Sequence, residues 1–312
     1  LTVTGVQTCA LPICIPRLLD AFARILPRGV RAVNWVQMAR SVLITGAGSG
    51  IGLATAGLLA ARGFRVYGGV RRPEDAGALE ALGVKPLFLD VTREEDLLRA
   101  RERLEGEGLY GLVANAGIAV AGPLELVPVS AFREALEVNV LGAFATVKAF
   151  LPLLRASRGR AVLMGSVSGL VALPLLGPYA ASKFALEALA DALRVELLPF
   201  GVKVALVEPG SVATPIWERS LRRAEGYLEP PPPGTEGVYG RYLEVARRLA
   251  EGNARRGLPP ERVAEAVYRA LTEPRPKARY LVAHPARARE TRLLRLLPAP
   301  LRDRLVARFL GA

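Results

Sequence analysis

The chain has 312 residues, of which 51% are hydrophobic and 23% charged, a balance typical of a globular protein with a sizeable core. Its single histidine, His284, and its two cysteines, Cys9 and Cys14, argue against a His/Cys zinc site and a disulfide scaffold. The net charge of +13 indicates an anionic partner without saying which one. No stretch approaches the roughly 20 apolar residues of a membrane span, so we expect a cytoplasmic protein.

Residues 1–37 precede the first methionine, Met38, and we expect them to be a non-native or disordered extension. The run from Val3 to Ile13 resembles the in-frame translation of a common sequencing-library adapter, so residues 1–13 are interpreted as an assembly artefact. A targeting segment is the rival hypothesis, because residues 14–37 contain four arginines and only one acidic residue, Asp20. Those arginines interrupt every apolar centre that a secretory signal would need. The functional domain is therefore expected at residues 38–312.

From residue 41 onward, short apolar runs alternate with longer stretches of helical period. The expected strands cover residues 41–45, 65–69, 84–89, 112–115, 160–166, 203–208 and 279–282. The expected helices include residues 131–157, 179–198 and 259–271. This alternation predicts an α/β fold, a single domain with a Rossmann-type doubly wound parallel sheet and helices on both faces. Ligands of such sheets bind at the carboxyl ends of the strands.

The pattern changes after Thr214, where an Arg-rich segment carries four consecutive prolines at 230–233. We expect a lid insertion at about residues 214–258, with a helix at either end. The tail, residues 288–310, indicates a basic amphipathic helix pair split by Pro298 and Pro300. We expect it to be solvated or to face an oligomer partner, with contact to an anionic membrane surface as the alternative.

A glycine-rich loop, TGAGSGIG at residues 45–52, follows an expected strand and opens an expected helix. Glycines there allow a tight turn and a close approach of the backbone to a pyrophosphate, and the helix N-terminus offers free N–H groups. A purely structural turn is the alternative, but the strand before it and the helix after it favour a nucleotide site. The expected cofactor contacts are Gly46, Ser49, Gly50, Ile51 and Gly52.

The spacing of this loop resembles that of the short-chain dehydrogenase/reductase family, and further motifs follow in the family's order. The resemblance is dense over residues 40–215 and continues weakly to about 282. One departure is Ala114, since the family often has Asn-Asn-Ala-Gly at this place. The resemblance implies an oxidoreductase with further cofactor contacts at Asp90, Val91, Asn115, Ala116, Gly117, Tyr179, Lys183, Pro209, Gly210 and Thr214.

The residues after the second expected strand bear on the choice of nicotinamide cofactor. An NAD enzyme usually has an acidic residue about 20 residues past the loop to bind the ribose 2′-hydroxyl. Here Arg71 and Arg72 stand in that region, and the first carboxylate is Glu74. Guanidinium groups bind a 2′-phosphate through charge-assisted hydrogen bonds, and Ser49 can donate another. The sequence therefore predicts NADP(H) as the cofactor. The alternative is that Arg71 and Arg72 are only solvated surface charges.

Tyr179 and Lys183 are four residues apart on an expected helix, so their side chains share a face. A positive charge at about 4 Å contributes roughly 4 kcal/mol at an effective dielectric of about 20, or roughly three units of pKa. Lys183, with an oxidised nicotinamide, is expected to lower the pKa of Tyr179 so that it can act as acid or base. The family resemblance implies that Ser166 orients the substrate carbonyl. It also implies that Asn139 holds a water that links Lys183 to solvent.

Segments 64–71, 138–142, 179–187 and 198–202 resemble the branch containing 17β-hydroxysteroid dehydrogenase type 1 and the retinol dehydrogenases. This implies that the protein interconverts a secondary alcohol and a ketone, or an alcohol and an aldehyde, on a bulky apolar substrate. The expected substrate walls are the lid and the apolar residues Val120, Leu170, Leu173 and Pro174. The family also implies a homodimer or homotetramer formed through residues 131–157 and 179–198.

Two other classes of function are weighed. A non-catalytic NADPH-sensing or scaffold protein with the same fold is the alternative hypothesis, which the complete Asn-Ser-Tyr-Lys set disfavours. Nucleic-acid binding is not expected, because only 6% of the residues are aromatic and no basic patch is interleaved with them.

Overall fold

A single parallel sheet organises residues 40–308, the part of the chain that the computed structural model describes. Its seven strands lie in the order β3-β2-β1-β4-β5-β6-β7. The strands are β1 Ser41–Ile44, β2 Arg65–Val70, β3 Lys85–Phe88, β4 Gly111–Ala114, β5 Arg160–Met164, β6 Lys203–Pro209 and β7 Arg279–Val282. All seven expected strands and the doubly wound parallel sheet are confirmed. The predictions for residues 1–37 lie outside the described residues.

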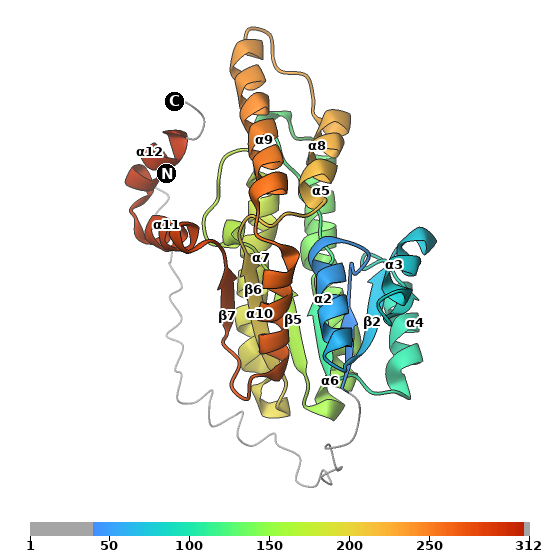
Figure 1. The fold of residues 1–312 in the computed structure, drawn as a ribbon. Helices are drawn as coiled ribbons and strands as arrows, with labels where there is room; N and C mark the ends of the chain where they lie inside the picture. The colour runs from blue at the N-terminus through green and yellow to red at the C-terminus, as the bar shows by residue number, and fades with distance from the viewer. Residues whose placement is uncertain (1–39, 309–312) are drawn as a thin grey trace, which may run out of the picture. The chain divides into compact units, whose positions relative to one another are not determined.

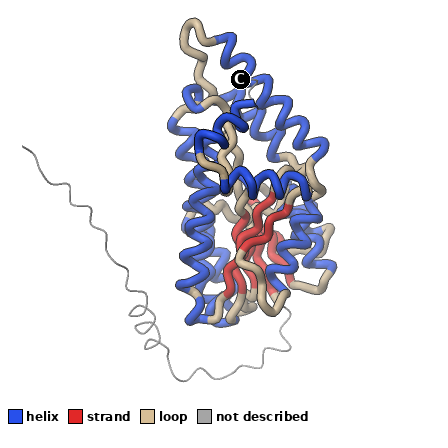
Figure 2. The backbone as a smooth tube through the Cα atoms, turned by 90° about the vertical axis from the view of Figure 1, so that its left-hand side faces the viewer, coloured by secondary structure: helices blue, strands red, loops and turns tan. Residues whose placement is uncertain are grey.

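Helices cover both faces of the sheet (Figure 1). They are α2 Gly50–Ala61, α3 Ala76–Glu80, α4 Glu94–Glu105, α5 Val129–Leu136, α6 Gly142–Ser157, α7 Gly177–Glu196, α8 Ile216–Tyr227, α9 Glu236–Arg256, α10 Pro260–Thr272, α11 Pro285–Leu296 and α12 Ala299–Ala307. Helices α2 and α10 pack on one face, and α4, α6 and α7 pack on the other. Figure 2 shows the strands with helices on either side.

The core follows from the two-residue period of the strands. In β1, Val42 and Ile44 belong to the cluster under α2 and α10, whereas Leu43 belongs to the cluster under α4, α6 and α7. All three are fully buried. A strand that is covered on both faces therefore reads as an uninterrupted apolar run, which is why the sequence marks these strands so clearly.

The longest apolar helical segment is Val129–Ser157, in which α5 continues through a π-helical turn at Glu137–Leu141 into α6. Its length and composition alone would allow it to cross a membrane. In this fold, however, Val147, Phe150 and Leu154 are buried in the core against the sheet. The segment therefore has the place of a core helix.

Two helices, α8 and α9, occupy the expected lid segment after β6 and extend past the carboxyl ends of the strands (Figure 1). The chain then returns along the sheet as α10, which begins at the proline pair Pro259 and Pro260, as the sequence predicts. After β7, the basic tail forms α11 and α12, which are separated at Pro298.

Candidate active site

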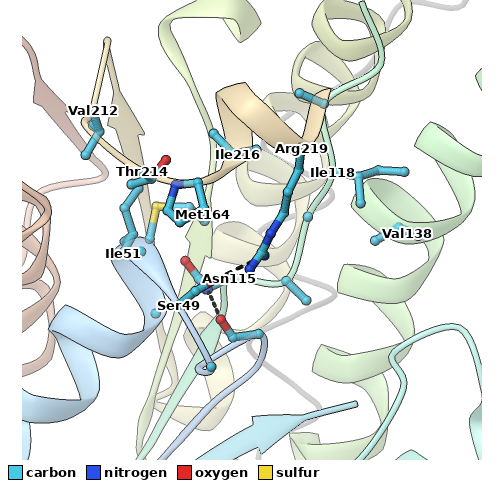
Figure 3. Close-up of a pocket in the computed structure, with 18 of the residues that line it drawn as sticks. Ser49, Ile51, Asn115, Ile118, Val138, Met164, Val212, Thr214, Ile216 and Arg219 are labelled. Atoms are coloured by element: carbon cyan, nitrogen blue, oxygen red, sulfur yellow. Dashed lines mark hydrogen bonds between the residues drawn. The ribbon is translucent and has the colours of Figure 1, made fainter. Parts of the chain in front are cut away.

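The site lies where the strand order reverses. The chain runs from β1 outward to β3 and then returns to β4 on the other side of β1. The loops after β1 and β4 therefore diverge from adjacent strands and leave a crevice at the carboxyl edge of the sheet. A cavity of about 280 Å³ opens at this place (Figure 3).

The glycine loop forms one wall of this cavity, and backbone contacts fix its path. Gly46 and Gly50 have positive φ values of 63° and 54°, which favour glycine. A Cβ on Gly52 would lie 2.3 Å from the carbonyl oxygen of Gly46 and 2.7 Å from Nδ2 of Asn115. Only glycine at 52 lets the first turn of α2 pack this closely beneath the loop.

Polar contacts tie this loop to the end of β4. Asn115 donates from Nδ2 to the carbonyl oxygens of Thr45 and Gly46, at 2.9 and 3.1 Å. The Thr45 hydroxyl accepts from the backbone N–H groups of Asn115 and Ala116, at 3.0 and 3.1 Å. The Asn-Ala-Gly motif therefore supports the loop, and Asn115, Ala116 and Gly117 all line the cavity.

Tyr179 and Lys183 lie one turn apart near the start of α7 and line the cavity together with Ser166. Lys183 Nζ lies 5.6 Å from the centroid of the Tyr179 ring and donates to the carbonyl oxygen of Met164 at 2.8 Å. Ser166, just after β5, accepts a hydrogen bond from the backbone N–H of Ser168 at 3.1 Å, which orients its hydroxyl group. The structure thus brings together three of the four expected catalytic residues in one cavity.

Burial dominates the protonation of this pair. It raises the pKa of Tyr179 above that of an ordinary phenol, and the Ser166 hydroxyl acts in the opposite direction. It lowers the pKa of Lys183 to about 8. The predicted lowering of the pKa of Tyr179 involves Lys183 together with an oxidised nicotinamide and stays a prediction, because desolvation is the larger influence on the phenol in this structure. A group with a further positive charge beside the phenol is needed to reverse the balance.

Asn139 is the fourth expected catalytic residue, and it lies behind the cavity instead of lining it. It is 1% exposed and sits in the π-helical turn. Its amide exchanges hydrogen bonds with the backbone of Ile118, at 2.8 and 2.9 Å, and donates to the hydroxyl of Ser182 at 2.9 Å. Ser182 in turn donates to the Tyr179 carbonyl at 2.7 Å. The side chain of Asn139 thus positions α7 and the loop after β4.

Arg71 and Arg72 follow each other directly after β2, but their side chains have different partners. Arg71 lines the cavity and lies 3.9 Å from the Asp90 carboxylate. Arg72 does not line it, because its guanidinium donates two hydrogen bonds to Asp75, at 3.1 and 3.0 Å. Asp90 also stays outside the lining, since its carboxylate accepts from Thr92. Asp75, which the sequence analysis does not single out, lines the cavity in their place.

The remaining expected cofactor residues reach the cavity. They come from the glycine loop, from the end of β3 and from the segment after β6: Gly46, Ser49, Gly50, Ile51, Gly52, Val91, Pro209, Gly210 and Thr214. Thr214 packs closely on the loop, since a Cβ on Gly50 would lie 3.1 Å from its methyl carbon. The start of the lid is therefore anchored to the glycine loop.

The lid supplies lining residues that sequence reasoning missed, namely Ile216, Trp217, Arg219 and Arg223. Figure 3 shows Arg219 extending from the lid toward Ser49. None of the four loop residues predicted as substrate walls, Val120, Leu170, Leu173 and Pro174, lines this cavity. Val120 is fully buried in a small core cluster, and Leu170 lines a second cavity beside β7. Helical period alone does not reveal which lid residues turn inward.

The fit of these residues to a dinucleotide rests on the glycine cradle, where an added Cβ at 52 would collide with backbone. No cluster of three His, Cys, Asp or Glu side chains that could hold a metal ion occurs within residues 40–308. Comparison with known proteins gives the family: the short chain dehydrogenase model matches residues 40–225. The chain belongs to the short-chain dehydrogenase family.

Several curated relatives support this assignment. The chain is 40% identical to human 17-beta-hydroxysteroid dehydrogenase type 1 over 257 residues, which cover 78% of this chain and 77% of that protein. It is 36% identical to NADPH-dependent 3-dehydrocapnine reductase of Ornithobacterium rhinotracheale, over 78% of this chain and 88% of that protein. The predicted family and its hydroxysteroid dehydrogenase-like relatives are confirmed.

Solved structures agree. A short-chain dehydrogenase from Streptomyces avermitilis matches with a TM-score of 0.69 and 28% identity, over 81% of this chain and 91% of that one. A short chain dehydrogenase from Burkholderia cenocepacia in complex with NADP matches with a TM-score of 0.64 and 27% identity, over 87% and 97% of the two chains. A homologue from Burkholderia phymatum was solved with NAD, with a TM-score of 0.69 and 27% identity, over 82% and 92%.

Proposed function

We propose that this protein is an NADP(H)-dependent oxidoreductase that interconverts a secondary alcohol and a ketone, or an alcohol and an aldehyde, on a bulky apolar substrate. The observation that carries the proposal is the placement of Ser166, Tyr179 and Lys183 in one cavity with the glycine loop. An NADPH-sensing or scaffold protein would need only a cavity that binds the cofactor, and not this acid–base set.

Each residue of the set has a distinct role. Ser166 donates to the substrate oxygen and orients its carbonyl, because its own hydroxyl is held by the Ser168 N–H. Tyr179 transfers the proton to or from that oxygen. Lys183, bonded to the Met164 carbonyl, holds a positive charge beside the phenol. Asn139 positions the segments that carry them.

The cofactor would be held by the glycine loop, the Asn115 to Gly117 segment and the Pro209 to Thr214 segment. When bound, it supplies or accepts the hydride, and its oxidised ring is positively charged. That charge acts in the same direction as Lys183 and offsets the burial that raises the pKa of Tyr179. The phenol of Tyr179 is therefore expected to ionise readily only when the oxidised cofactor is bound beside it.

Arg71 supports a preference for NADP(H), because it lines the cavity at the end of β2, where a 2′-phosphate would arrive. A relative at 36% identity is described as NADPH-dependent, and one solved relative is an NADP complex. Arg72 gives no such support, because Asp75 engages it. The preference for NADP(H) is therefore assigned to Arg71.

The apolar substrate class is supported by the wall opposite the glycine loop, to which Ile118, Val138, Ile216 and Trp217 contribute. Trp217 is fixed by a hydrogen bond from its indole N–H to the Val212 carbonyl at 2.8 Å. A relative at 40% identity is named for a hydroxysteroid. A panel of steroids, retinoids, aliphatic ketones and sugars, followed at the nicotinamide absorbance, tests the class, and oxidation of NADPH by none of them would favour the sensor alternative.

We also propose a homodimer or homotetramer formed through α5, α6 and α7. These helices and the π-helical turn between α5 and α6 expose large apolar side chains, including Leu141 at 52%, Phe144 at 41% and Phe184 at 44%. Such a surface is typical of an interface between copies. Sedimentation of the wild type and of Phe144→Glu tests this, and an unchanged mass in the variant would contradict it. A cytoplasmic location stays a prediction.

The central test is Tyr179→Phe. We expect turnover to fall by at least about 1000-fold while NADPH binding is retained, because the ring keeps its packing and loses only its acid–base group. Tyr242→Phe, on α9 and outside the cavity lining, is the matched control and should keep full activity. Normal turnover by Tyr179→Phe would refute the assignment.

Arg71→Ala tests the cofactor preference. We expect the KM for NADPH to rise about tenfold and that for NADH to stay unchanged, because one charge-assisted contact is lost. Arg72→Ala is the matched control, since Asp75 already occupies its guanidinium. A wild-type preference for NADH would overturn the NADP(H) proposal.

A further inference from the structure

The lid helix α8 is docked on the rest of the protein by three polar side chains. Arg219 donates from Nη1 to the Ser49 hydroxyl at 3.2 Å. Arg223 pairs with Glu134 of α5. The Tyr227 hydroxyl donates to the Ala121 carbonyl at 2.6 Å and accepts from its N–H at 2.9 Å. Of these three side chains, only Arg219 bonds to the glycine loop.

Arg219 differs from the two other arginines of α8 in its partner. Arg222 pairs with Glu218 at 3.4 Å, and Arg223 pairs with Glu134. Within residues 40–308, no carboxylate oxygen lies within 4 Å of the Arg219 guanidinium. A serine hydroxyl carries no charge, so the positive charge of Arg219 is uncompensated at the mouth of the cavity.

The partner serine stands at a position that itself favours negative charge. Ser49 is the N-cap residue of α2, and its side chain makes no capping hydrogen bond to that helix. The first backbone N–H groups of α2 therefore face the cavity with the positive end of the helix dipole. The helix end and the guanidinium approach the same region of the cavity from opposite walls.

The chain between the two walls fixes this approach. Thr214 and Pro215, directly before α8, would lie 3.1 and 3.8 Å from a Cβ on Gly50. Arg219 follows Pro215 by about one helical turn and lines the cavity. The packed start of the lid thus helps to place Arg219 over the loop.

We propose that Arg219 is a cofactor-binding residue contributed by the lid, and that its guanidinium binds the diphosphate of the nicotinamide cofactor. The inference rests on the proposed function, because it assumes a dinucleotide in this cavity. Bidentate, charge-assisted hydrogen bonds suit a guanidinium and a phosphate. The diphosphate, and not the 2′-phosphate, is assigned because Arg219 contacts the N-cap of α2, whereas Arg71 stands at the end of β2.

This contact would couple the cofactor to the lid. A ligand that binds both the glycine loop and Arg219 favours the conformation in which α8 covers the cavity. By reciprocity, a lid held in that conformation binds the cofactor more tightly. The cofactor would therefore bind first and order the lid for the substrate, whose apolar wall includes Ile216 and Trp217 of the same helix.

The first experiment measures the Kd of NADPH and of NADH by the fluorescence of the reduced ring, without turnover. We expect Arg219→Ala to weaken both about tenfold and by the same factor, and Arg219→Lys to weaken both less. Arg222→Ala is the matched control on the same helix and should change neither Kd. Added salt should weaken the wild type more than Arg219→Ala, because the charged contact is exposed to solvent.

The second experiment follows hydrogen exchange of α8 with and without NADPH. We expect NADPH to slow exchange in α8 of the wild type and of Arg222→Ala, and to slow it clearly less in Arg219→Ala. Because Arg219 is exposed, the variant should keep its thermal stability, which a melting curve verifies. Equal protection of α8 in all three proteins would overturn the coupling.

Each other outcome has a distinct meaning. A loss confined to NADPH would overturn the diphosphate assignment and move Arg219 to the 2′-phosphate. An unchanged Kd for both cofactors, with a raised KM for the carbonyl substrate, would overturn the inference and leave the proposed function intact. If the wild type bound neither cofactor, the proposed function itself would fail.

Discussion

The glycine loop and the lid border the same cavity, but different interactions hold them in place. In the loop, a Cβ at Gly52 would collide with backbone, and Thr45 and Asn115 bond to main-chain groups. In the lid helix α9, a Cβ at Gly237 would meet nothing within 4 Å. The loop is therefore fixed mainly by close backbone contacts, whereas α8 of the lid is docked mainly by the side chains of Arg219, Arg223 and Tyr227.

The largest expected effect contrasts two glycine substitutions. Gly52→Ala should weaken cofactor binding by about 1000-fold or more, because the new methyl group must displace the Gly46 carbonyl at 2.3 Å and so deform the loop. Gly237→Ala should leave the Kd unchanged and slightly raise the melting temperature, since alanine favours the helix. Titration of both variants with NADPH checks this, and comparable affinities would break the contrast between loop and lid.

Next comes a pH effect on stability that arises at Glu208, which lines the second cavity beside β7. Glu208 of β6 is 2% exposed, and burial, reinforced by the Glu187 carboxylate, raises its pKa to about 7. Arg279, which also bonds Asp191, and Arg295 act against this rise. Because the folded pKa exceeds the unfolded one, the stabilisation is complete below about pH 4.5 and is lost as the pH rises through about 7.

The wild type should therefore lose up to about 3 kcal/mol of unfolding free energy from this group between pH 5 and pH 8. Glu208→Gln should remove that pH dependence, because the amide cannot ionise. Urea unfolding at the two pH values measures it. A substitution in the lid, such as Gly237→Ala, should leave the pH dependence unchanged, and an equal slope in Glu208→Gln and wild type would contradict the role of Glu208.

The third effect concerns Lys183, whose pKa burial lowers to about 8. The kcat/KM for carbonyl reduction should fall as the pH rises through about 8, because the neutral amine no longer stabilises the developing phenolate of Tyr179. Lys183→Met should lower kcat by about 100-fold and abolish that inflection. A pH–rate profile gives both values, and an inflection that survived in Lys183→Met would assign it to another group.

The smallest effect tests the lid. Tyr227→Phe removes the two hydrogen bonds to Ala121, with a cost of about 1 kcal/mol. We expect the KM for a bulky substrate to rise a few-fold, with the Kd for NADPH and the inflection near pH 8 unchanged. A large loss of cofactor affinity would show that the lid is coupled to the loop through Tyr227 as well as through Arg219.

Much of the fold could be predicted, because its signals are local. The strands of the sheet are continuous apolar runs, since both faces are covered, and the glycine loop and Pro259 mark helix starts. The shared helix face of Tyr179 and Lys183 follows from their spacing of four residues. These features depend on residues close together in the chain, whose geometry the backbone sets.

The structure decided what depends on distant partners. Arg71 and Arg72 are adjacent, yet only the fold shows that Asp75 draws Arg72 away from the cavity. The resemblance implies a water-relay role for Asn139, which stays a prediction, and only the fold shows that its side chain bonds to Ile118 and Ser182.

The lid makes the same point most clearly. Nothing near Arg219 in the sequence distinguishes it from Arg222 or Arg223, because all three lie in one basic helix. Only the packing of Thr214 against the glycine loop turns Arg219 toward Ser49, 170 residues earlier in the chain. The apolar strands, the glycine loop and the spacing of Tyr179 and Lys183 are readable from the chain alone, whereas tertiary packing sets which charged side chains face the cavity, because their partners are distant in the sequence.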